Sequence, residues 1–285
     1  MSVKQYLCPS TLQEALKILK EADGAARVAA GATDLFLDLE KEKKSAEILV
    51  DVRKIPELRA AERRGEAFYI GGAVTHTEIE QNAQIRELFP ALAKGASVVG
   101  GPQIRNVGTI AGNVVNAQPA ADTAVPLIAY GAEAVIAGYD GQERTVPVED
   151  LYEGPGRSRL DASREILVGF LLPVGKYSCS GFAREGKRNA LTLPMLNLAA
   201  ALCVRDGVIA GASLVAGPVS VKPLHLTDAE NLLTGKAPSA ALFEEAGALA
   251  EAQAAPRDSL LRGGSRFRKE LLRVMVRELL SELAL

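Results

Sequence analysis

The spacing of apolar residues predicts a helix, a strand and a second helix in the first part of the chain. Between residues 11 and 22, apolar side chains recur at i, i+3, i+4 and i+7, which gives a helix one apolar face, and a hydroxyl residue before it can cap its first turn. A short apolar run at residues 25–30 indicates a buried strand. A second helical stretch follows at residues 35–44, and residues 48–52 indicate another strand.

The centre of the chain alternates strand and helix signals until it reaches a glycine-rich segment. Residues 68–74 predict a strand, and residues 91–99 predict a helix of small residues. His76 lies at a corner between a strand and a short helix, where a surface or capping role is expected rather than a catalytic one. Residues 100–122 hold four glycines and two prolines, so they form neither one long helix nor one regular strand. Strand character returns over residues 125–137.

The last part of the chain predicts a small sheet followed by helices. Residues 165–172 indicate a strand, and we place a domain boundary near residue 175. Two strands, at residues 198–204 and 208–215, are joined by Asp206-Gly207, a sequence typical of hairpin turns. Helical periodicity then covers residues 228–233, 240–254 and 267–283. The second domain is therefore not a repeat of strand–helix–strand units.

The composition limits the classes of protein and partner. At roughly 150 residues per domain, 285 residues correspond to two domains, and a chain that is 48% hydrophobic and 24% charged is typical of a soluble protein. A net charge of -2 offers no positive field for nucleic acid or anionic lipid, so no nucleic-acid partner is expected. No apolar stretch has the form of an export signal or a membrane span.

The cysteines and histidines are too few and too scattered to form a metal centre. The chain has three cysteines with no C-x-x-C pair and two histidines, so we expect neither an iron–sulfur cluster nor a zinc site held by this chain. Unpaired cysteines suit a reducing compartment, and the expected location is the cytoplasm.

Two glycine-bearing segments are candidates for binding chemistry. Residues 29–35 form a turn between a strand and a helix, where unpaired backbone N–H groups and small side chains would let a phosphate approach. A plain capped connection would have the same sequence, so both interpretations stay open. Residues 100–122 suit the hydroxyls and phosphates of a nucleotide, or a structural loop with Asx turns. The short polar side chains of this second segment are Thr109, Asn113, Asn116 and Asp122.

Several common catalytic motifs are missing. The chain has no G-x-x-x-x-G-K-[ST], no G-x-G-x-x-G after a strand, no G-x-S-x-G and no H-E-x-x-H, which excludes the usual nucleotide hydrolases, Rossmann dehydrogenases, serine hydrolases and zinc proteases. A basic cluster at residues 262–269 is typical of a solvated helix start, and a contact surface for another subunit is the alternative.

Two longer motifs carry a family resemblance. Ala-Gly-Ala-Thr-Asp-Leu stands at residues 30–35, and Ile-Arg-Asn-Val-Gly-Thr-Ile-Ala-Gly-Asn stands at residues 104–113, followed by Asn-Ala-Gln-Pro-Ala-Ala-Asp at residues 116–122. Further matching segments keep a fixed order at residues 51–58, 71–75, 152–156, 165–167 and 262–268. This ordered set spans essentially the whole chain and resembles the FAD-binding subunit of the molybdenum hydroxylases, the family of xanthine dehydrogenase and carbon monoxide dehydrogenase.

The resemblance implies an α+β fold in two parts. Residues 1–175 would form an FAD-binding domain of the vanillyl-alcohol-oxidase (PCMH) type, with subdomains at about 1–56 and 57–175. Residues 176–285 would form the family's smaller C-terminal α+β domain, an antiparallel sheet with helices.

The resemblance also implies which residues hold FAD. The two glycine-bearing loops would clasp the diphosphate, and Asp122 would bind the ribityl and nucleotide region. Ile166 and Leu167 would lie beside the isoalloxazine, which Arg184 would approach. The implied cofactor-binding residues are Val28, Ala29, Ala30, Gly31, Ala32, Thr33, Asp34, Leu35, Ile104, Gly108, Thr109, Gly112, Asn113, Asn116, Ala121, Asp122, Ile166, Leu167 and Arg184. No residue of this chain is expected to act as a catalytic acid or base.

Four residues depart from the family pattern. Ala32 and Ala111 stand where the family often has glycine, so a Cβ must fit against the cofactor, and a positive φ at either position would be strained. Gln118 replaces a common Ser, and Arg184 replaces a common Lys. Both loops keep enough small residues that FAD is still the expected cofactor.

The activity implied by the resemblance is electron transfer within an oxidoreductase. A large partner subunit with a molybdenum cofactor would hydroxylate the substrate, and a small partner with two [2Fe-2S] clusters would pass the electrons to FAD on this chain. FAD would hand them to NAD+ or another acceptor. The complex would be a hetero-oligomer, such as a dimer of heterotrimers. The alternatives are a self-contained flavin reductase similar to UDP-N-acetylenolpyruvoylglucosamine reductases and a flavin-free interaction subunit.

Overall fold

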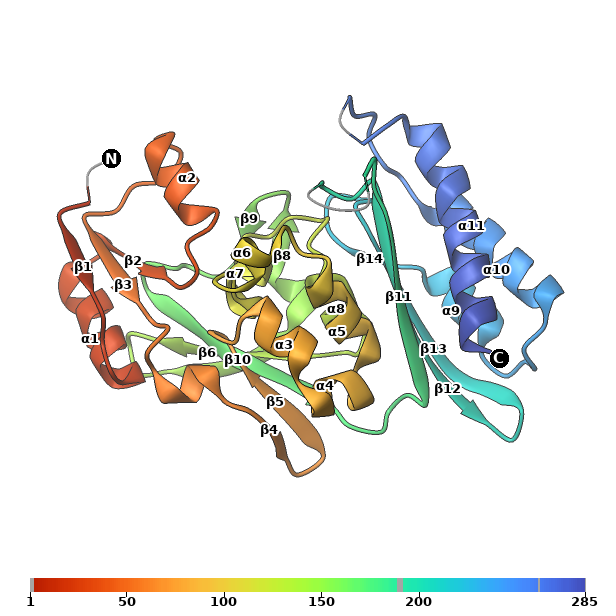
Figure 1. Ribbon diagram of the computed structural model, residues 1–285, viewed down its shortest axis with the longest axis horizontal. Helices are drawn as coiled ribbons and strands as arrows, with labels where there is room; N and C mark the ends of the chain where they lie inside the picture. The colour runs from red at the N-terminus through yellow and green to blue at the C-terminus, as the bar shows by residue number, and fades with distance from the viewer. Residues whose placement is uncertain (1–2, 189–191, 261, 285) are drawn as a thin grey trace.

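The chain begins with a three-stranded parallel sheet in the order β1-β3-β2, covered by helix α1 (Figure 1). The computed structural model describes residues 3–188, 192–260 and 262–284. Helix α1 forms as predicted, because Thr11 caps it and its apolar face packs on Val50. The second helix ends before the predicted residue 44, since Glu42 has a φ of +54°. The elements are β1 (Gln5–Leu7), α1 (Leu12–Ala22), β2 (Ala26–Ala29), α2 (Leu35–Glu40) and β3 (Ile48–Asp51).

The second part is a five-stranded antiparallel sheet in the order β4-β5-β10-β6-β7, with short helices packed on one face. Its strands are β4 (Ala61–Arg64), β5 (Ala67–Gly71), β6 (Glu133–Gly138), β7 (Glu143–Pro147) and β10 (Glu165–Pro173), and a small hairpin pairs β8 (Tyr152–Gly154) with β9 (Arg157–Ser158). Its helices are η1 (Pro56–Arg59), α3 (His76–Gln81), α4 (Ala83–Leu88), α5 (Pro90–Ser97), α6 (Pro102–Arg105), α7 (Ile110–Val115), α8 (Ala124–Ala129) and η2 (Val148–Leu151).

The central strand β10 serves two separate cores. Ile166 and Val168 pack with α1 and β3, whereas Phe170 packs with the short helices on the opposite face. A bulge shifts the pairing with β6 between Leu167 and Gly169. A near-continuous apolar run was therefore to be expected, because both faces of this strand are buried.

The C-terminal part is a four-stranded antiparallel sheet in the order β11-β12-β13-β14, with helices on one face. Leu198 and Leu202 of β12 pack in the core formed with these helices, while Ala199 and Ala201 pack in the core of the preceding part. Figure 1 shows the sheet between α10 and α11 on one side and α5 and α8 on the other. No helix within the described residues is long and apolar enough to cross a membrane. The elements are β11 (Cys179–Glu185), β12 (Leu196–Arg205), β13 (Val208–Gly217), β14 (Leu224–His225), α9 (Thr227–Leu233), α10 (Ala240–Gln253) and α11 (Ser265–Leu283).

One predicted element is wrong. Strand character was expected from residue 125, but Ala124–Ala129 is helix α8. All six residues of this helix are buried between the two large sheets, so it has no polar face whose spacing could show a helical period.

A substitution of Phe170 tests whether this face of β10 is part of the core. We expect Phe170→Ala to lower the free energy of unfolding by about 3–5 kcal/mol, because the side chain is fully buried in β10. Phe267→Ala is the matched control, since Phe267 is half exposed and its loss should cost about 1 kcal/mol or less. Chemical denaturation of both variants measures the difference, and equal destabilisation would contradict the assignment of Phe170 to the core.

Candidate functional site

The first glycine-bearing loop leaves a row of backbone donors unused. From Gly31 to Leu35, the backbone N–H groups donate to no acceptor among the described residues. Ala32 has a φ of +52°, which turns the chain sharply between β2 and α2. The expectation that a positive φ would strain an alanine therefore applies at Ala32. It does not apply at Ala111, which lies in helix α7 and has no positive φ.

The second loop is tied by backbone hydrogen bonds to the segment that connects β5 to α3. The N–H of Ile110 donates to the carbonyl of Val74 over 3.0 Å, and the N–H of His76 donates to the carbonyl of Gly108 over 3.1 Å. Thr109 caps α7 by accepting a hydrogen bond from Gly112 N–H. The loop is thus held rigidly by the central sheet.

The two loops touch each other. A Cβ placed on Gly31 would lie 2.0 Å from the carbonyl oxygen of Val107, so only glycine permits this contact. Between the loops opens a cavity of about 440 Å³. The structure brings thirteen of the predicted cofactor-binding residues to its wall: Val28, Ala30, Gly31, Ala32, Thr33, Asp34, Leu35, Ile104, Gly108, Thr109, Gly112, Asn113 and Asn116.

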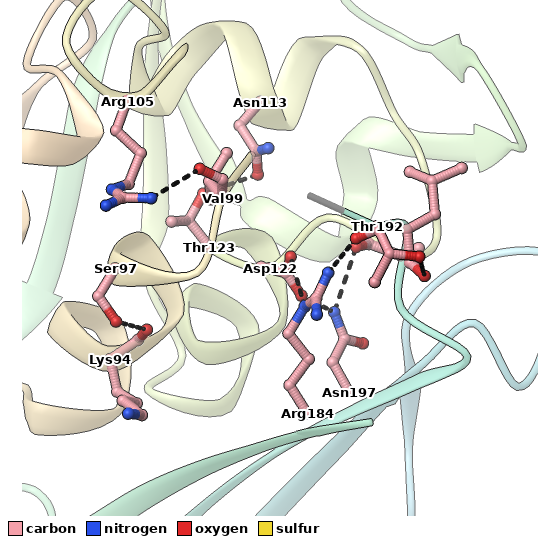
Figure 2. A network of polar contacts seen from close by, with 12 residues as sticks. Lys94, Ser97, Val99, Arg105, Asn113, Asp122, Thr123, Arg184, Thr192 and Asn197 are labelled. Atoms are coloured by element: carbon pink, nitrogen blue, oxygen red, sulfur yellow. Dashed lines mark hydrogen bonds and ion pairs between the residues drawn. The ribbon is translucent and has the colours of Figure 1, made fainter. Parts of the chain in front are cut away.

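The other six predicted residues lie outside this wall. Ala29 is buried behind the first loop, and Ile166 and Leu167 are buried on β10. Ala121 is also buried, next to Asp122. Asp122 and Arg184 pair with each other at the junction with the C-terminal sheet (Figure 2).

Asp122 is the centre of a buried polar network. Its carboxylate lies 3.3 Å from Arg184 Nε and accepts a hydrogen bond from Asn197 Nδ2 over 2.8 Å. Arg184 also donates to the carbonyl of Thr192, as Figure 2 shows. Burial raises the pKa of Asp122 to about 6, opposed by the Arg184 charge and the Asn197 hydrogen bond. This network joins α8 and its preceding loop to β11 and β12.

Sequence reasoning missed several residues of the cavity wall. His76, expected at the surface or as a cap, is 2% exposed, so that expectation is wrong, and Thr75 is the cap of α3. The remaining missed residues are Arg27, Lys44, Val99, Val115, Glu153, Gly156, Arg157, Ser158, Leu160 and Ala162. Five of them, at residues 153–160, come from the β8–β9 hairpin and the residues after it. The glycine-rich sequence at residues 152–156 was the available signal.

The chemistry of this wall fits an anionic dinucleotide. Backbone N–H groups, threonine hydroxyls and the amides of Asn113 and Asn116 offer hydrogen-bond donors. Arg27 and Arg157 add positive charge beside the carboxylates of Asp34 and Glu153, while Lys44 is paired with Asp38. The small side chains at residues 30–32 leave the backbone open to a phosphate. No group of three or more possible metal ligands is found within the described residues.

Comparisons with known proteins support the resemblance. Residues 2–175 match the family model described as "FAD binding domain in molybdopterin dehydrogenase", and residues 182–283 match "CO dehydrogenase flavoprotein C-terminal domain". The chain is 32% identical to the nicotinate dehydrogenase FAD-subunit of Eubacterium barkeri, covering 81% of this chain and 79% of that one. It is 30% identical to the xanthine dehydrogenase FAD-binding subunit of Escherichia coli O157:H7, covering 97% and 94%.

Solved structures are similar over the same length. A chain of the reconstituted CO dehydrogenase from Oligotropha carboxidovorans superposes with a TM-score of 0.91 at 25% identity, covering 100% of this chain and 98% of that one. A chain of quinoline 2-oxidoreductase from Pseudomonas putida 86 superposes with a TM-score of 0.90 at 25% identity, covering 98% and 96%.

The contact between the loops can be tested at Gly31. We expect Gly31→Ala to push the first loop away from Val107 and to raise the Kd for FAD about tenfold or more, because the displaced N–H donors no longer reach one ligand together. Gly211→Ala is the control, since its Cβ would have no neighbour closer than 3.9 Å. Flavin titration measures both, and unchanged affinity in Gly31→Ala would refute the contact's role.

The Asp122 network predicts a pH dependence. The pKa of Asp122 is raised from 3.8 to about 6, so between these values the folded protein holds a proton that the unfolded chain lacks, and stability falls as pH rises. The unfolding free energy of wild type minus that of Asp122→Asn should therefore fall by about 2 kcal/mol from pH 4 to pH 7. Denaturant titrations at several pH values measure this difference, and a flat or rising difference would contradict the assignment.

Proposed function

Because this chain belongs to the family of FAD-binding subunits of molybdopterin dehydrogenases, we propose that its FAD passes electrons from [2Fe-2S] clusters on a partner subunit to NAD+ or another acceptor. FAD is the cofactor, and the chain is a component of an oxidoreductase. The observation that carries the proposal is the cavity between the two loops, which lies wholly inside the part of the chain matched by the FAD-binding family model.

The cavity-wall residues would hold the cofactor. Backbone donors from Gly31 to Leu35, with the hydroxyl of Thr109 and the side-chain amides of Asn113 and Asn116, would bind the diphosphate, and Arg27 and Arg157 would balance part of its charge. When bound, FAD would supply a carrier that can take up electrons one at a time from iron–sulfur clusters and release two together as a hydride to NAD+. The six residues outside the wall stay a prediction, with Ile166, Leu167 and Arg184 assigned to the isoalloxazine. This chain's residues bind and orient the cofactor, and none is assigned a proton transfer.

The names of the relatives support the proposed partners. Similar chains include carbon monoxide dehydrogenase medium chains and a subunit of xanthine dehydrogenase. We assign this chain a large partner subunit with a molybdenum cofactor and a small partner with two [2Fe-2S] clusters, in a cytoplasmic dimer of heterotrimers. We also assign the FAD-binding domain to residues 1–175 and the C-terminal domain to residues 176–285. A self-contained reductase is not favoured, because relatives that match over nearly their full length are named as a subunit or a medium chain.

The proposed function is tested with the purified full chain and with its complex. We expect the chain to bind FAD and, when loaded, to transfer electrons from NADH to an artificial dye. Affinity purification from the native host should recover an iron–sulfur subunit and a molybdenum subunit. A chain that cannot be loaded with FAD would refute the cofactor assignment, and flavin-loaded chain with no reaction with NADH would refute NAD+ as acceptor.

A substitution of Gly112 tests the cofactor site by mutagenesis. We expect Gly112→Val to lower FAD occupancy, because a Cβ at this position already lies 3.1 Å from Thr109 Oγ1 and the added methyl groups would displace the loop. Gly211→Val is the matched control on β13, away from the cavity. The ratio of flavin to protein absorbance measures occupancy, and equal ratios in both variants would remove Gly112 from the site.

A further inference from the structure

His76 is a polar side chain of the cavity wall whose role the loops do not explain. Its ring packs on Gly108, where an added Cβ would lie 3.3 Å from His76 Cδ2 and 3.6 Å from Nε2. The side chain is 2% exposed, and Nδ1 is buried with no hydrogen-bond partner among the described residues. Because Nδ1 is closed off from solvent, only Nε2 of this ring can meet a ligand in the cavity, and no described residue forms a hydrogen bond with Nε2.

The surroundings determine which ring nitrogen carries the proton. Burial, aided by the nearby Arg105 charge, lowers the pKa of His76 to about 4, so the ring is neutral at pH 7 and carries one proton. A proton on Nδ1 would be a buried donor without an acceptor, which is rare in folded proteins. The proton therefore resides on Nε2, on the ring edge that faces Gly108.

The position of the ring indicates which part of the ligand it meets. Gly108 follows Val107, whose carbonyl oxygen contacts Gly31 where the two loops converge. The row of unused backbone donors begins at this same point. A ligand group that satisfies several donors at once, beside cationic side chains, is a phosphate rather than a base or a flavin ring.

We propose that the Nε2–H of His76 donates a hydrogen bond to a diphosphate oxygen of the bound dinucleotide and so fixes its position between the loops. This inference rests on the proposed FAD-binding function and assigns a binding residue that the sequence motifs do not contain. Because the ring stays neutral, it adds a directed donor to the site without adding another positive charge.

Two amide variants of His76 separate the two ring nitrogens. A glutamine amide nitrogen reaches the position of Nε2, whereas an asparagine amide nitrogen reaches only that of Nδ1. We expect His76→Asn to raise the Kd for both FAD and ADP about tenfold or more, since a hydrogen bond to a charged group is lost, and His76→Gln to stay close to wild type. ADP is the second probe because it carries the diphosphate without the isoalloxazine. Thermal unfolding of the ligand-free variants controls for folding.

The outcomes are distinct. Weaker binding of FAD and ADP in His76→Asn, with rescue in His76→Gln, supports the proposal. Three results would overturn it: equal affinities in wild type and His76→Asn, equal losses of affinity in the two variants, or a loss of affinity for FAD without a loss for ADP. In each of these cases, FAD binding by the wild-type chain would leave the proposed function standing. Failure of wild type to bind FAD and ADP would overturn both.

Discussion

The close approach of Gly31 to the carbonyl of Val107 is the contact on which the proposed binding site depends. The two loops are far apart in the sequence, and each is anchored separately, one to the parallel sheet through β2 and the other to the central sheet through Gly108 and Ile110. Only where they meet can donors from both reach one ligand. The absence of a side chain at Gly31 therefore lets the two loops form one site, whereas a methyl group at this position would hold them apart.

The central strand β10 makes this meeting possible. Because both of its faces are buried, it fixes the parallel sheet with α1 on one side and the short helices with the second loop on the other. The N–H of Gly72 donates to the carbonyl of Val168, and the N–H of Ala111 donates to the carbonyl of Gly72, so the position of α7 is linked by backbone bonds to β10. The geometry of the cavity is thus a property of the sheet, not of flexible loops.

The sequence allowed much of the fold and about half of the cavity wall to be predicted, and the physical reason differs from residue to residue. Amphipathic α1 and the hairpin turn at Asp206-Gly207 have local signals, and both form as expected. Helix α8 has no polar face, so its period was hidden. The burial of His76 depends on its contact with the second loop, so it cannot be predicted from the residues next to it in the sequence. Arg27 and Arg157 reach the cavity only through the tertiary arrangement.

The pairing of Asp122 with Arg184 gives the C-terminal sheet a role in the site. Both side chains are almost completely buried, and burying an unpaired charge is far more costly than burying a bonded pair. Asn197 on β12 donates to Asp122 and also to the carbonyl of Ala120, so the loop after α7 is held by the second sheet. That loop is continuous with Asn113 and Asn116 in the cavity wall. A displacement of the C-terminal sheet would therefore move polar groups that line the cavity, although no described residue of the sheet itself lies in the wall.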